Sequence, residues 1–127
     1  MVNSISDFLI LSFLILLISN LSFAQSSDQL FDSIVKYKHQ NPSLALEYGL
    51  EYKKLSLDRK IDMEIIQFYG AMGEILSNMG FDASALEYLR QTIKLNEAIP
   101  SDQRKFSEID ELPGVLLNIG NIYFKNK

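Results

Sequence analysis

Large apolar residues in the middle of the chain recur at intervals of three and four positions. Between residues 61 and 79 they are Ile61, Ile65, Tyr69, Met72, Leu76 and Met79. Only a helix brings residues at this spacing onto one face, whereas a half-buried strand requires alternation with a period of two. No stretch of the chain shows that alternation, so the sequence predicts an all-α fold.

Four further stretches carry helical periodicity, and residues that begin or end helices lie at their limits. We expect these helices over residues 28–39, 42–57, 83–98 and 111–124. Asn41 before Pro42 is typical of a helix start, because Asn accepts a hydrogen bond from a free N–H and Pro has no N–H to satisfy. Gly80 is expected to end the central helix and Asp82 to cap the next. Pro113 falls in the first turn of the last predicted helix, where proline is tolerated.

The first 24 residues differ in composition from the rest of the chain. Between residues 8 and 18 only Ser12 is not apolar, and small residues follow at Ser22 and Ala24. A short apolar segment followed by this small–x–small pattern is typical of a secretory signal peptide. We therefore expect residues 1–24 to be removed by cleavage between Ala24 and Gln25.

An uncleaved membrane anchor is the alternative for this segment. Residues 8–24 are just long enough to span a bilayer, at the short end of the usual range of about 17–25 residues. Neither Lys nor Arg precedes the apolar segment, which is unusual for a cleaved signal. On both interpretations the domain over residues 25–127 lies outside the cytoplasm, either periplasmic or secreted, or anchored to the inner membrane.

Two short patterns recur along the helical part. Ala-Leu-Glu-Tyr occupies residues 45–48 and again 85–88, and Met72-Gly73 has a counterpart 47 positions later in Ile119-Gly120. A glycine inside a helix costs about 1 kcal/mol relative to alanine, so glycines at equivalent places indicate a packing role. Glycine on one helix and alanine on its antiparallel neighbour allow the two backbones to approach closely.

These patterns resemble the tetratricopeptide repeat family. Its first helix carries a large residue, then Leu-Gly, then Tyr, and its second helix carries small residues. The matching residues are Leu116, Ile119-Gly120 and Tyr123 in one copy, and Tyr69, Met72-Gly73, Leu76, Gly80 and Ala85 in another. The resemblance implies antiparallel helix-hairpin repeats, a solenoid of about two repeats plus an unpaired final helix. An ordinary bundle without repeats is the alternative.

The chain departs from the family pattern in two respects. Its intervals of 40 and 47 residues exceed the usual length of 34, which implies longer helices and a linker over residues 99–112. The first predicted helix has no Leu-Gly. The last predicted helix is apolar on most sides, so we expect the repeat domain to be truncated before the helix that would cover it.

In this family the inner face of the stacked first helices forms a concave groove for an extended peptide or another protein. The resemblance therefore implies a protein- or peptide-binding module. The side chains expected to project into its groove are Gln67, Glu74, Asn78, Asn121 and Lys125. Asn side chains suit such a groove because they both donate to and accept from a peptide backbone of any sequence.

The sequence contains few residues that would support catalysis, metal binding or nucleic-acid binding. His39 is the single histidine and there is no cysteine, so we predict neither a nucleophile–base pair nor a metal site, and expect no enzymatic activity and no cofactor. The formal charge is −4 and basic residues gather only in pairs such as Lys53-Lys54, which argues against a nucleic-acid surface.

A second function remains open at this stage. Exported helical repeats of this spacing also resemble the extracytoplasmic sensory part of bacterial receptors. In such receptors a histidine kinase, a nucleotide cyclase or a DNA-binding regulator forms the output domain. On that interpretation the chain is one segment of a larger signalling protein.

Overall fold

A computed structural model describes residues 5–20, 25–56, 58–100, 102 and 108–127. Within these residues all the secondary structure is helical. The helices are α1 (Ile5–Asn20), α2 (Ser27–Tyr37), α3 (Pro42–Ser56), α4 (Met63–Asn78), α5 (Asp82–Ala98) and α6 (Glu108–Lys125). The all-α prediction is confirmed. Each of the five helices predicted after the first 24 residues is present, and its ends lie within three residues of the predicted limits.

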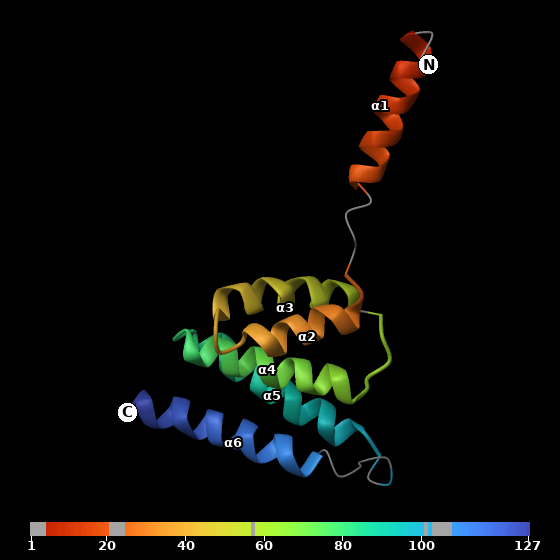
Figure 1. Cartoon of the computed structure of the whole chain (residues 1–127). Coiled ribbons are helices and arrows are strands. Elements are labelled where there is room, and N and C mark those ends of the chain that lie inside the picture. The colour runs from red at the N-terminus through yellow and green to blue at the C-terminus, as the bar shows by residue number, and fades with distance from the viewer. Residues whose placement is uncertain (1–4, 21–24, 57, 101, 103–107) are drawn as a thin grey trace.

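Helices α2 to α6 form a stack of antiparallel helices, in which α2 pairs with α3 and α4 with α5 (Figure 1). Helix α4 lies at the centre and contacts α2, α3, α5 and α6. Helix α6 lies at the end of the stack opposite to the α2–α3 hairpin and packs on both α4 and α5. This arrangement places α2 and α6 on either side of α4.

Helix α1 stands apart from the stack (Figure 1) and makes no contact with another helix in the described residues. No helix in the described part of the chain is both long and apolar enough to cross a membrane. Gln25 is exposed at the start of the described domain, whereas Ala24 lies outside the described residues. Cleavage between Ala24 and Gln25 therefore stays a prediction.

The apolar core is continuous through α4, which is buried on two faces. On one face Phe68, Met72 and Ile75 pack against buried residues of the first hairpin, namely Leu30, Ile34, Ala45 and Tyr52. On the other face Leu76 packs against buried residues of α5 and α6, namely Ala85, Leu89, Val115 and Ile122. The burial of these side chains in two clusters joins the hairpins and α6 into one domain.

A polar network fastens the connection between α3 and α4. The buried Tyr52 hydroxyl donates to Glu64 Oε1 at 2.8 Å, and an Arg59 N–H donates to the same oxygen at 2.8 Å. The other Arg59 nitrogen donates to Asp62 at 2.9 Å. Burial, reinforced by the hydrogen bond to Glu64, raises the pKa of Tyr52. The phenol therefore stays protonated and continues to donate.

The helix ends agree with most of the predicted signals. Asn41 accepts a hydrogen bond from the Leu44 N–H at 3.2 Å, Pro42 is the first residue of α3, and Gly80 ends the α4 turn with a φ of 85°. Two predictions are wrong. The residue at the N-cap of α5 is Phe81, which makes no capping hydrogen bond, and Asp82 is instead the first residue of the helix. Helix α6 begins at Glu108, which places Pro113 in its second turn rather than its first.

The two predicted packing glycines lie in different surroundings. A Cβ atom added to Gly73 would lie 2.5 Å from both Cγ and Cδ2 of Leu89 and 3.3 Å from its backbone nitrogen. A Cβ added to Gly120 would meet nothing within 4 Å. The packing role is therefore confirmed at Gly73, where α4 and α5 approach closely, and is wrong at Gly120, which is exposed.

Substituting alanine at the two glycines should have effects of opposite sign. Gly73→Ala should lower the free energy of unfolding by about 1–3 kcal/mol, because the new methyl group must displace the buried Leu89 side chain. Gly120→Ala makes the same change in open space and should raise it by as much as about 1 kcal/mol. Urea denaturation followed by circular dichroism measures both. Similar effects at the two positions would contradict the difference in packing.

Candidate functional site

A cavity of about 370 Å³ lies between α2, α4 and α6, and we call it the central groove. Each helix contributes residues from one of its faces. The lining residues are Phe31, Val35 and Lys38 from α2, Gln67, Gly70, Ala71 and Glu74 from α4, and Gly114, Val115 and Asn118 from α6. Residues from three helices therefore converge on one space, as is typical of binding sites between packed helices.

Small residues keep the central groove open. On α4 it is lined by the buried Gly70, which has no side chain, and by the half-buried Ala71, which has only a methyl group. On α6, a Cβ added to Gly114 would meet nothing within 4 Å. Phe31 and Val35 add apolar surface from α2. The groove therefore combines an apolar side with room for a main chain close to the α4 backbone.

An ion pair between α2 and α4 lines one side of the groove. Lys38 Nζ of α2 is 2.9 Å from Glu74 Oε2 of α4, and the two side chains are 26% and 27% exposed. His39 Nε2 lies 3.7 Å from the other Glu74 oxygen. About a quarter of each side chain stays exposed, so a ligand can reach the pair. A ligand carboxylate can approach Lys38, or a ligand ammonium can approach Glu74.

Two amide side chains supply further hydrogen-bonding capacity. Gln67 of α4 and Asn118 of α6 are half-buried and line the groove from neighbouring helices. Among the described residues, neither side chain has a hydrogen-bonding partner in the protein. Each amide offers two N–H donors and a carbonyl acceptor. Together they can satisfy both the N–H and the C=O groups of an extended chain.

Only some of the five residues that the sequence predicted for a groove line the central groove. Gln67 and Glu74 line the central groove. Asn78 is exposed at the end of α4 and Asn121 is exposed on α6, and neither lines the groove. Lys125 instead donates to Asp82 of α5 at 2.8 Å. Two of the five predicted residues are thus brought together, and three are not.

Asn118 is the groove residue that the sequence prediction missed. It stands three positions after the buried Val115 and four before the buried Ile122, so it lies near the inward side of α6. The signal that could have identified it is this spacing from the buried residues. The sequence contains both Asn118 and Asn121, and only the rotation of α6 about its axis distinguishes them.

Lys125 and Asn126 hold the end of α6 against the start of α5. Lys125 Nζ donates to one oxygen of Asp82 at 2.8 Å, and the Asn126 amide donates to the other at 2.9 Å. The hydrogen bond from Lys125, followed by that from Asn126, lowers the pKa of the Asp82 carboxyl group. Asp82, expected to cap a helix, thus joins two helices instead.

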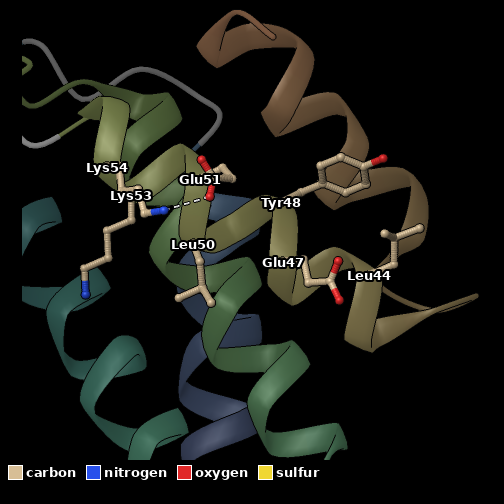
Figure 2. A pocket seen from close by; sticks show the side chains of 7 residues that line it. All are labelled: Leu44, Glu47, Tyr48, Leu50, Glu51, Lys53 and Lys54. Atoms are coloured by element: carbon tan, nitrogen blue, oxygen red, sulfur yellow. Dashed lines mark hydrogen bonds and ion pairs between the residues drawn. The ribbon is translucent and has the colours of Figure 1, made fainter. Parts of the chain in front are cut away.

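A larger hollow of about 730 Å³ lies over α3. Figure 2 shows that its lining residues are spread along this one helix: Leu44, Glu47, Tyr48, Leu50, Glu51, Lys53 and Lys54. The dashed contact joins Lys54 to Glu51 at 2.8 Å along the same helix. Because a single helix supplies the whole lining, polar groups do not converge there from different elements. The central groove is the stronger candidate site.

No group of three or more His, Cys, Asp or Glu side chains in the described residues is arranged to hold a metal ion. Comparisons of the chain with models of protein families, with curated proteins and with solved structures gave no match. The resemblance to tetratricopeptide repeats therefore stays a prediction. Any functional proposal rests on the geometry of the central groove.

The contribution of Lys125 to stability should depend on pH. Because the folded state lowers the pKa of Asp82, the stabilisation is fully present above the ordinary Asp pKa of about 3.9. It is lost as the pH falls through the lower pKa of the folded state. The free energy of unfolding should therefore be higher in the wild type than in Lys125→Met near neutral pH, and this difference should shrink in acid. Lys94→Met, an exposed change on α5, is the control, and a pH-independent difference for Lys125→Met would contradict the assignment.

Proposed function

We propose that this chain is an exported, non-catalytic helical-repeat module that binds a protein or an extended peptide in the central groove. The observation that carries the proposal is the placement of Gln67 and Asn118 beside the small residues Gly70 and Ala71. This combination matches a peptide main chain, which needs space and both donors and acceptors.

Packing at equivalent positions supports the repeat part of the proposal. On α4, Phe68, Met72 and Ile75 pack back on the first hairpin. Their counterparts 47 positions later, Val115, Ile119 and Ile122 on α6, pack back on the second hairpin. Apolar residues at the same spacing on α4 and α6 thus pack against the hairpin that precedes each helix, as stacked repeats do.

The groove residues favour recognition of a main chain over recognition of one small molecule. The amides of Gln67 and Asn118 pair with peptide groups whatever the side chains of the ligand. Phe31 and Val35 offer apolar surface to a ligand side chain, and the Lys38–Glu74 pair offers either charge. Affinity then comes from the main chain, and selectivity comes from one apolar and one charged position.

The arrangement of α1 supports export. Its apolar residues form a helix that contacts no other helix in the described residues, so its removal would leave the packed domain unchanged. That is the behaviour expected of a leader segment attached to an independently packed domain.

Peptides selected from a random display library on the purified chain would test the proposal. Asn118→Ala and Gln67→Ala should each weaken the binding of a selected peptide about tenfold, because each removes a hydrogen bond worth roughly 1–1.5 kcal/mol. Asn121→Ala is the matched control, since Asn121 lies three positions from Asn118 on the same helix but is exposed outside the groove. Fluorescence polarisation with a labelled peptide gives the dissociation constants.

A second variant tests occupancy of the groove without removing a polar group. Gly114→Phe adds a side chain where a Cβ meets no protein atom, so the fold should persist while the ring fills the groove. Peptide binding should then be lost without a fall in the thermal midpoint. Binding that survives Gly114→Phe, or that Asn121→Ala weakens as much as Asn118→Ala, would place the ligand elsewhere.

A further inference from the structure

Helix α6 exposes apolar side chains on the side away from the core, and one of them, Tyr123, also accepts a hydrogen bond from Arg90 of α5 at 2.6 Å. Leu116, Leu117, Tyr123 and Phe124 are 53%, 64%, 50% and 82% exposed. Gly120 lies among them, because positions three and four apart share one side of a helix. We call these five residues the outer face of α6. It lies apart from the central groove, which α6 lines with other residues.

The matching face of α4 shows what such a surface packs against. The residues 47 positions before Leu116, Gly120 and Tyr123 are Tyr69, Gly73 and Leu76. There Gly73 lies so close to α5 that an added Cβ would come within 3.3 Å of the Leu89 backbone nitrogen. A face of this composition is therefore able to pack against another helix at close range.

The outer face is just large enough for a small interface between two copies. With side-chain areas of about 150–250 Å² for large residues, the exposed fractions amount to roughly 500 Å² of apolar surface. That is near the upper end of the largest patch on a typical monomer, about 300–600 Å². Complete burial of the outer face on both copies would remove about 1,000 Å² from solvent, which is the smallest area expected of a specific interface.

The outer face is also complementary to itself. If two α6 helices cross in antiparallel orientation at Gly120, Leu116 and Leu117 of one copy meet Tyr123 and Phe124 of the other. The absence of a side chain at Gly120 allows the helices to approach closely at the crossing point.

We propose that two copies of this chain associate through their α6 helices, which cross in antiparallel orientation at Gly120. The occupant of the outer face is thus the same face of a second copy. Such a two-fold contact closes on itself and yields a dimer rather than a fibre. It leaves the central groove of each copy open, because the groove lies on another side of α6.

Sedimentation equilibrium of the full chain measures this association. Every protein in the test, the reference included, carries Phe8→Lys and Phe13→Lys, which interrupt the apolar surface of α1 with charges without touching another helix. Phe124→Lys should raise the dimer dissociation constant at least about tenfold by burying a charge. Gly120→Leu should do the same although it adds apolar surface, because its side chain separates the two helices.

The control for these variants is Leu50→Lys, which introduces the same charge at a leucine that is 49% exposed on α3. It should leave the dissociation constant unchanged within about twofold. Gly120→Leu should not lower the thermal midpoint, since a Cβ at this position meets no protein atom and leucine favours a helix more than glycine does. That result separates a loss of association from a loss of folding.

Three outcomes would overturn the proposal. The first is a reference chain that stays monomeric. The second is a dimer that Gly120→Leu leaves intact or that Leu50→Lys disrupts as strongly as Phe124→Lys. The third is a monomer that instead captures a synthetic peptide of residues 82–98, the sequence of α5, since the outer face would then accept a solenoid helix rather than a second copy.

Discussion

The burial of α4 on two faces is the constraint on which the rest of the structure depends. Phe68 and Ile75 hold the first hairpin on one face, while Gly73 and Leu76 hold α5 and α6 on the other. Apolar burial alone is not directional, but the contact of Gly73 with Leu89 fixes how closely α4 and α5 approach. A shift of α4 would therefore disturb its packing against the first hairpin and against α5 and α6.

The groove is a consequence of this central position. Because α2 and α6 both pack on α4 from opposite sides, the space between them has the α4 surface as its base. The small residues Gly70 and Ala71 line that base. The site is thus formed by the packing that stabilises the domain, and its shape is set before any ligand arrives.

The sequence predicted the helices well because the period of three and four is a local property of the chain. Signals at single residues, such as Asn41 and Gly80, were likewise local. The structure differed where a residue's role depends on the neighbouring helix. Spacing alone could not show that Asn118 rather than Asn121 faces the groove, or that Asp82 would bond to α6, because both depend on how α6 is rotated and placed.

The distribution of aromatic residues determines which parts of the fold can be followed by intrinsic fluorescence. The chain has six tyrosines and no tryptophan, so its intrinsic ultraviolet emission comes from tyrosine. Five of the six belong to the first core cluster, in which Tyr52 lies 4.5 Å from Phe68 between ring centroids. Tyr123 alone lies on α6, half-exposed. Emission will therefore follow mainly the first hairpin, α4 and Tyr88 of α5, and only Tyr123, which accepts a hydrogen bond from Arg90 of α5, will register whether α6 has come away from the stack.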